Sequence, residues 1–416
     1  MLGRNLFLVN VLCLCITGFP VNAYSKSGGH KHHAQVAEAC KDTTAPPSLK
    51  CAQAPTARFD ANGRLWVAWV YGGHVYLSAS IDKGRTFNVP VKVNAVAEKI
   101  YAKDENRPKL AFGPKGQIYL SWTQKLKEPR FSGHIRFARS LDGGNNFSTP
   151  LIVNDHREAT SHRFDVMAVN NKGDIYIAWL DKRDLLAAKK AGQAYNGAAL
   201  YYALSTDNGK RFKPNKKIQD NTCQCCRVAM AMDSDQLPVI LWRTIYGDNI
   251  RDHALVKFKG RNQAGTPVRA SHDNWHIEGC PHHGPAISIA DDGIYHLTWF
   301  NNAAERHGLF YARATDHGQS FSSPENFGDY HKAAAHADVL SLGQQVYRTW
   351  KEFDGKQAML YVQQSRDGGQ HWSTRKQLAA TTAPADHPFL VRDKSEVYLS
   401  WHRQGEAYRL IRLSKP

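Results

Sequence analysis

Two short segments of the chain concentrate side chains that bind metals or form disulfides. The first contains Cys223, Cys225 and Cys226, and the second contains Cys280 followed by His282 and His283. Thiolates and imidazoles are the donors that Cu(I) and Zn(II) prefer. The C-x-C-C spacing differs from the paired spacing of common structural zinc sites. The six residues therefore predict a copper or zinc site, with disulfide bonding as the alternative.

The disulfide interpretation follows from the number of cysteines. The chain has 8, and six remain when Cys13 and Cys15 of the N-terminal apolar run are set aside. An even number of cysteines in an exported chain favours disulfides. We expect one bond between Cys40 and Cys51, and two more among the four cysteines of the segments above.

A second set of chemically active residues recurs along the chain. Reading back about 11 to 16 residues from each of seven spaced tryptophans gives an arginine or a histidine every time. These seven rim residues are Arg58, Arg107, Arg163, Arg227, His283, His336 and His387. Paired N–H donors of arginine match carboxylate, sulfate or phosphate groups. Together the rim residues predict a site for an anionic ligand such as an acidic saccharide; the alternative is that each pairs with a nearby acid such as Asp338.

The tryptophans themselves mark the elements that must position these residues. An alternating strand ends at Trp69, Trp122, Trp179, Trp242, Trp299, Trp350 and Trp401, at intervals of 51 to 63 residues. Such an interval suits a four-stranded blade. The sequence predicts an all-β propeller of seven blades, with six blades as the alternative. The last copy has room for three strands, so we expect a strand preceding Thr56 to complete it and close the ring.

A repeated turn accompanies the strands. The pattern S-x-D-x-G-x-x-aromatic begins at Ser80, Ser140, Ser205, Ala314 and Ser365, with alanine replacing serine in the fourth copy. Its aspartate can accept backbone N–H groups, and its glycine allows a positive φ. The pattern resembles the Asp-box repeat, and the chain resembles Asp-box propellers, of which sialidases are the best known. The resemblance implies that these aspartates are structural and lie away from the ligand face.

The resemblance also implies a glycosidase activity, provided that the catalytic groups are present. Sialidases hold a carboxylate with three arginines and use a tyrosine nucleophile, a glutamate and an acidic aspartate. By residue type the candidates are Tyr246, Glu278, and either Asp104 or Asp165. None of them lies in a family motif, so a non-catalytic binding or assembly protein is the alternative. The C-x-C-C and G-C-P segments resemble those of an exported subgroup described as sialidase-like.

The N-terminal segment and the net charge of the chain indicate its location and its partners. Arg4, an apolar run and the small residues around Ala23 predict a signal peptide over residues 1–23, a flexible leader over 24–54 and one propeller domain over 55–416. The run is shorter than the roughly 20 residues that span a bilayer, so we expect a periplasmic or secreted protein. A net charge of +17 favours anionic partners. Basic pairs without an aromatic-rich motif, in an exported chain, argue against nucleic acid.

Overall fold

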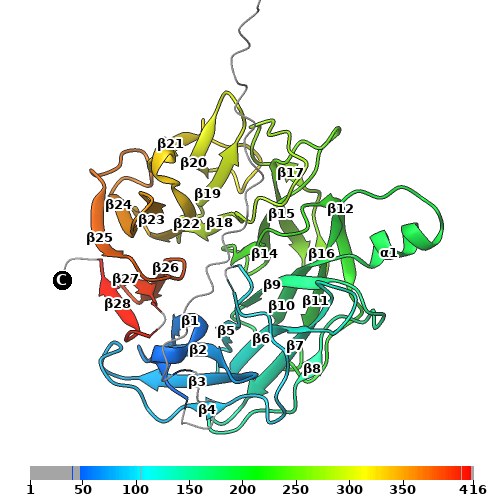
Figure 1. Cartoon of the computed structure of the whole chain (residues 1–416), viewed down its shortest axis with the longest axis vertical. Helices are drawn as coiled ribbons and strands as arrows, with labels where there is room; N and C mark the ends of the chain where they lie inside the picture. Colours follow the sequence, from blue (N-terminus) through cyan, green and yellow to red (C-terminus); the bar gives the residue numbers. More distant parts are fainter. Residues whose placement is uncertain (1–39, 41–46, 104, 404, 414–416) are drawn as a thin grey trace, which may run out of the picture. The chain divides into compact units, whose positions relative to one another are not determined.

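The chain folds into seven antiparallel sheets that follow one another around a common axis (Figure 1). The computed structural model describes Cys40 and residues 47–103, 105–403 and 405–413, all within one compact unit, Val36–Pro416. The chain is a seven-bladed β-propeller, so the predicted fold is confirmed and the six-bladed alternative is wrong, because the last strands form a sheet of their own. The predicted signal peptide and most of the predicted leader lie outside the described residues.

The first four blades run from the N-terminal side of the ring. Blade 1 contains β1 (Gln53–Phe59), β2 (Leu65–Tyr71), β3 (His74–Ser80) and β4 (Val91–Lys92). Blade 2 contains β5 (Lys109–Phe112), β6 (Ile118–Lys125), β7 (Gly133–Ser140) and β8 (Leu151–Ile152). Blade 3 contains β9 (His162–Val169), β10 (Ile175–Asp181), β11 (Ala198–Ser205) and β12 (Lys216–Thr222), with helix α1 (Arg183–Lys190) between β10 and β11. Blade 4 contains β13 (Ala229–Met232), β14 (Pro238–Arg243), β15 (His253–Gly260), β16 (Gln263–Ala264) and β17 (Val268–Arg269).

The remaining three blades complete the ring. Blade 5 contains β18 (Ala286–Ile289), β19 (Tyr295–Asn302), β20 (His307–Ala314) and β21 (Glu325–Phe327), followed by the short helix η3 (Tyr330–Lys332). Blade 6 contains β22 (Ala335–Leu342), β23 (Gln345–Phe353), β24 (Ala358–Ser365) and β25 (Lys376–Thr381). Blade 7 contains β26 (Phe389–Asp393), β27 (Glu396–Trp401) and β28 (Arg409–Arg412). No helix among the described residues is long and apolar enough to cross a membrane.

The second strand of each blade carries the core. Every residue of β2 and of β10 is buried, because both faces of these strands pack against neighbouring sheets. All seven repeat tryptophans are at most 2% exposed. The apolar clusters between successive blades contain them, so each tryptophan fixes the position of a blade against the next one.

The S-x-D-x-G segments form turns between third and fourth strands. In blade 2, Asp142 Oδ1 accepts the backbone N–H groups of Asn145 and Asn146 at 3.1 and 3.0 Å, and Gly144 N donates to Ser140 Oγ at 2.9 Å. Hydrogen bonds from Asn146 lower the pKa of Asp142 to about 2. These bonds agree with the structural role expected for the repeated aspartates.

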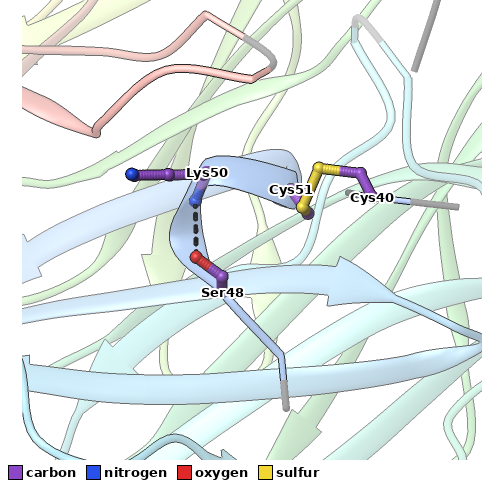
Figure 2. The surroundings of a disulfide bond; sticks show 4 residues. All are labelled: Cys40, Ser48, Lys50 and Cys51. Atoms are coloured by element: carbon purple, nitrogen blue, oxygen red, sulfur yellow. Dashed lines mark hydrogen bonds between the residues drawn. A yellow bond between two sulfur atoms is a disulfide. The ribbon is translucent and has the colours of Figure 1, made fainter. Parts of the chain in front are cut away.

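No described residue before Thr56 joins the last blade. The described residues directly around Thr56 form β1, the innermost strand of blade 1, which pairs with β2. Blade 7 has three strands in the described part of the chain, and the predicted closing strand stays a prediction. The short helix η2 (Leu49–Cys51) bridges the ends, because Lys50 O accepts a hydrogen bond from Gly405 N at 2.8 Å. The expected disulfide between Cys40 and Cys51 is confirmed, and Figure 2 shows it beside η2.

Candidate functional site

The antiparallel order of each blade divides its connections between two faces of the ring. The segments that lead into an inner strand share one face with the connections between second and third strands; we call this the rim face. The S-x-D-x-G turns lie on the opposite face, called here the turn face. Most of the candidate residues precede or begin an inner strand, so the fold gathers them on the rim face.

Three buried sulfurs converge in the connection between β12 and β13. Cys223 Sγ lies 3.8 Å from Cys225 Sγ and 3.7 Å from Cys226 Sγ. All three cysteines are buried. Sulfurs bound to one tetrahedral ion at about 2.3 Å would lie ~3.8 Å apart. The observed spacing matches that of ligands around one metal ion, and also ordinary contact between sulfurs, and it is far from the roughly 2 Å of bonded sulfurs.

Cys280 and His282 extend this group from the connection between β17 and β18. The sulfurs of Cys225 and Cys280 and a ring nitrogen of His282 all lie within 4.8 Å of one another. Cys223, Cys225, Cys226, Cys280 and His282 are called the thiol cluster below. Its four cysteines are free thiols, so the two disulfides expected among them are not formed. The loop directs the sulfurs toward one centre without bringing any pair to bonding distance.

Cationic side chains surround the buried half of the thiol cluster. Arg251, fixed by Asn249, directs Nη1 toward Cys223 Sγ at 3.6 Å. The pKa of Cys223 lies well below its usual value because the other two thiols donate to its sulfur, with Arg243 and Arg251 adding positive charge. A lowered pKa favours the thiolate, which is the form that binds metals.

The exposed half of the cluster has a cation of its own. A hydrogen bond from Cys225 and the charge of Lys182 lower the pKa of Cys280 to about 7. Lys182 begins the connection that contains α1, so blade 3 supplies it. On the neighbouring segment, Gly284 leaves room for the backbone of Arg227, which a side chain at this position would overlap. The glycine thus holds the segments of Cys226 and Cys280 close together.

Two of the four rim arginines have internal partners. Arg107 Nη2 forms an ion pair with Asp386 Oδ1 at 2.6 Å. Arg227 Nη2 donates to Ala337 O at 2.7 Å, and Nη1 lies 3.5 Å from Glu105 Oε2. Both arginines therefore tie inner segments of distant blades together.

The other two arginines have guanidinium groups without a carboxylate partner among the described residues. Arg163 stacks on Tyr101 and Phe164 at 4.5 and 4.7 Å, and its Nε makes no hydrogen bond within the described chain. Arg58 lines a central cavity of about 230 Å³ to which all seven blades contribute. Arg163 therefore has a buried Nε without a hydrogen bond within the described chain, whereas Arg58 is the one of these two arginines that lines the central cavity.

The rim histidines form a column of rings. The ring of His336 lies 3.5 Å from that of His387 and 4.7 Å from that of His283, centroid to centroid. Burial lowers the pKa of all three, so they are neutral near pH 7 instead of the cationic donors that the sequence predicts. Glu105 accepts a hydrogen bond from His336 Nδ1 at 3.1 Å. Although burial opposes it, Arg227 and His336 bring the pKa of Glu105 down to about 2.

The candidate catalytic residues lie in separate surroundings. Asp165 accepts a hydrogen bond from Ser121 Oγ at 2.6 Å between blades 2 and 3. Tyr246 packs under Arg269 at 4.7 Å, Glu278 is exposed, and these two share no hydrogen bond within the described chain. Asp104 lies outside the described residues. A tyrosine–glutamate pair of the sialidase kind is therefore not formed by these candidates.

Three residues of the rim face are not predicted from the sequence. Glu105 lies two positions before Arg107, and the pairing of this acid with His336 could not be inferred without the fold. Arg251 and Lys182 follow second strands, and only the antiparallel order of the blades places them beside the cysteines. Lys182 follows its repeat tryptophan by three residues and Arg251 follows its own by nine, so no shared spacing marks them in the sequence.

Comparisons with known proteins support the fold. No family model and no curated protein matches the chain, so membership of the Asp-box family stays a prediction. An ulvan lyase of polysaccharide lyase family PL25, bound to a saccharide of glucuronic acid and rhamnose 3-sulfate, is 12% identical with a TM-score of 0.55, covering 87% of this chain and 93% of that one. A protein of unknown function from Dyadobacter fermentans is 16% identical with a TM-score of 0.52, covering 77% and 96%.

A sialidase is also similar in structure. The Hadza microbial sialidase Hz136 is 13% identical with a TM-score of 0.50, covering 82% of this chain and 73% of that one. At such identities the likeness is one of fold, because one propeller architecture carries many unrelated activities. The sialidase-like propeller is thus shared, and the function has to be argued from the residues of the site.

Proposed function

We propose that the chain binds a soft metal ion, Cu(I) or Zn(II), through the thiol cluster on the rim face of blades 4 and 5. The observation that supports this proposal is the convergence of three buried sulfurs at 3.7 and 3.8 Å. The three thiols lie in the apolar cluster between blades 3 and 4 and have no disulfide partner among the described residues, so their sulfurs remain available to a metal ion. Cys280 and His282 add donors at the exposed side.

The surroundings of the sulfurs support the same proposal. Arg251 contacts Cys223 Sγ, and Lys182 lies near Cys280, so positive charge accompanies the thiolates. A bound ion would take the place of the thiol protons, and the buried segment would keep water and oxidants from the sulfurs. Such a site suits an exported binding or assembly protein that carries a metal ion without performing chemistry on it.

Metal analysis combined with thiol counting tests the proposal. The full chain is purified under anaerobic conditions, and its reactive thiols are counted before and after addition of Cu(I) or Zn(II). In the metal-free protein we expect the four thiols of the cluster to be reduced, in addition to Cys13 and Cys15 where residues 1–23 are retained, and we expect the ion to protect at least three of the four. His371→Ala, on the turn face, serves as a control and should bind metal like the wild type. Two disulfides in the native protein and no bound metal would overturn the proposal.

A second candidate function, binding of an acidic saccharide, is favoured by Arg163. Its guanidinium lies on aromatic faces with Nε unsatisfied, and burial together with the charge of Arg163 lowers the pKa of Lys182, so a second cation lies nearby. The ulvan lyase that shares the fold is bound to an acidic saccharide. A platform of aromatic rings and a cation suits a sugar carboxylate or sulfate.

Binding and turnover assays separate this candidate from the first. Fluorogenic sialosides, uronic acid saccharides and sulfated saccharides are tested against wild type, Arg163→Gln and the charge-matched control Arg85→Gln, which changes an exposed arginine of the turn face. Selective loss of binding in the Arg163 variant supports a saccharide site. An equal loss of saccharide binding in both variants would mean that the net charge of the protein, and not a site at Arg163, causes the binding.

A further inference from the structure

We infer that the thiol cluster holds two Cu(I) ions bridged by the Cys225 thiolate, with Cys223 and Cys226 completing an inner site and Cys280 and His282 an outer one. The inference rests on the proposed function and adds the number, the oxidation state and the order of the ions.

The arrangement of the donors gives the number of ions. The donor atoms form two groups of three, and within each group all atoms lie within 4.8 Å of one another. Cys225 belongs to both groups, and the groups do not merge into one set at that spacing. Two sulfurs bound to one ion at about 2.3 Å can be no more than ~4.6 Å apart. One ion therefore cannot use all five donors, whereas two ions that share a sulfur can.

The charges around the cluster indicate univalent ions. Four thiolates with two divalent ions are neutral overall, whereas four thiolates with two univalent ions leave excess negative charge. The cluster has Arg251 at 3.6 Å from Cys223 Sγ, together with Arg243 and Lys182 in its surroundings. These cations would attract an anionic complex, whereas a neutral complex would gain no such net attraction, and sulfur donors prefer Cu(I).

Burial gives the order of the ions. The three cysteines of the inner group are buried, whereas Cys280 and His282 of the outer group are exposed. A partner carrying Cu(I) could exchange ligands with the outer donors only, because the inner sulfurs are covered. The outer ion is thus the one that is gained and lost first, and Cys225 is the sulfur through which an ion passes inward.

Stoichiometry in cysteine variants tests the inference. The full chain is titrated anaerobically with Cu(I) against a chromophoric Cu(I) chelator, and bound ions are counted by native mass spectrometry. We expect two ions in the wild type, one in Cys280→Ser, one in His282→Ala and one in Cys226→Ser. In Cys225→Ser both sites lose a ligand, and we expect affinity to fall by at least 100-fold. His276→Ala, an exposed imidazole of the same segment outside both groups, should retain two ions.

X-ray absorption detects whether two copper ions lie close together, which counting ions in the cysteine variants does not show. A metal–metal scattering path should be present at two equivalents of Cu(I) and absent both at one equivalent and in Cys280→Ser. Thermal unfolding of the metal-free variants checks the fold, and the variants at exposed Cys280 and His282 keep the test valid if a buried variant does not fold.

Three other results would contradict either the second ion, its location or the proposed function. One ion in the wild type that Cys280→Ser does not affect would overturn the second ion and leave the proposed function intact. No bound ion would overturn both. Two ions that survive in Cys225→Ser, one of them lost in His387→Ala, would place the second ion at the Glu105, His336 and His387 group, whose donor atoms also lie within 4.8 Å of one another.

Discussion

The turn face and the rim face use their polar side chains in opposite ways. In the turn of blade 6, Asp367 Oδ1 accepts the N–H groups of Gln370 and His371 at 3.1 and 3.0 Å. On the rim face, the polar contacts of Cys223 Sγ within the described chain are with two other thiols and the guanidinium of Arg251. The aspartates of the repeated turns satisfy backbone N–H groups, whereas the cysteines occur at two neighbouring junctions and their sulfurs do not bond the backbone of the described residues. Residues that repeat from blade to blade therefore indicate a role in the fold, whereas cysteines that break the repeat indicate a binding site.

The comparison predicts that the largest change in stability comes from the turn face. Gly369 has a φ of 82°, and a Cβ there would overlap the Tyr311 hydroxyl. We expect Gly369→Ala to lower the free energy of unfolding by about 3 kcal/mol, measured by urea denaturation, from strain and overpacking together. Gly143→Ala is the matched control: φ is 74°, but nothing lies within 4 Å, so only the backbone strain of ~1–2 kcal/mol remains. Equal effects would show that the contact with Tyr311 is unimportant.

On the rim face, we expect a substitution beside the cysteines to lower the affinity for metal more than the stability of the fold. We expect Arg251→Met to weaken Cu(I) binding about 10- to 100-fold, as is typical when a neighbour of a metal ligand is removed. Arg269→Met removes a comparable arginine that contacts Asn274 and not the thiols, and it should leave the Cu(I) affinity unchanged. Competition with a chelator measures both affinities. A similar decrease in the two variants would mean that Arg251 acts through the fold alone.

A natural difference among the turns predicts a smaller effect. Ser205 Oγ accepts a hydrogen bond from Gly209 N at 3.0 Å, whereas Ala314 occupies this position in blade 5. Ser205→Ala should destabilise the fold by about 1 kcal/mol, and Ala314→Ser should stabilise it by a similar amount. Metal stoichiometry should stay the same in both. Thermal and urea unfolding measure the changes, and a destabilising Ala314→Ser would show that blade 5 cannot form this bond.

The smallest expected effect is confined to acid. The pKa of Asp142, about 2 in the fold, lies below the usual aspartate value of 3.8. Its hydrogen bonds therefore stabilise the fold above about pH 4, and this contribution is lost as the pH falls toward 2. Asp142→Asn should make the free energy of unfolding less dependent on pH in that interval. Asp291→Asn, at an exposed aspartate outside the turns, is the control and should follow the wild-type dependence.

The sequence predicts the repeated parts of the fold well, because periodic residues report their own environment. Each repeat tryptophan lies in a second strand, which in six of the seven blades continues past it, and the S-x-D-x-G pattern encodes its own turn. Blade closure could not be predicted in the same way. Residues 53–59 read equally well as a last or a first strand, and the choice depends on pairing with β2 across the whole ring.

The site was predicted by residue type more reliably than by role. The cysteines and His282 do converge, since neighbouring blades bring their connections together. Arg107 and Arg227 are instead occupied by acids far away in the sequence, Asp386 and Glu105. The state of His336 depends on burial, which no local pattern records. Long-range pairing and desolvation are thus the two properties that a repeat pattern does not contain.

The three-stranded last blade makes the ring mechanically uneven. Within the described residues the polypeptide itself crosses six of the seven junctions between blades, whereas β26 and β1 meet through side chains, with one backbone hydrogen bond from Gly405 to Lys50 nearby. On unfolding, the propeller should separate where neighbouring blades are not joined by the polypeptide, which is the junction between blades 7 and 1. We expect this seam to separate first on heating. The thiol cluster, whose residues lie in the connections between blades 3 and 4 and between blades 4 and 5, should keep its shape after the ring has begun to open.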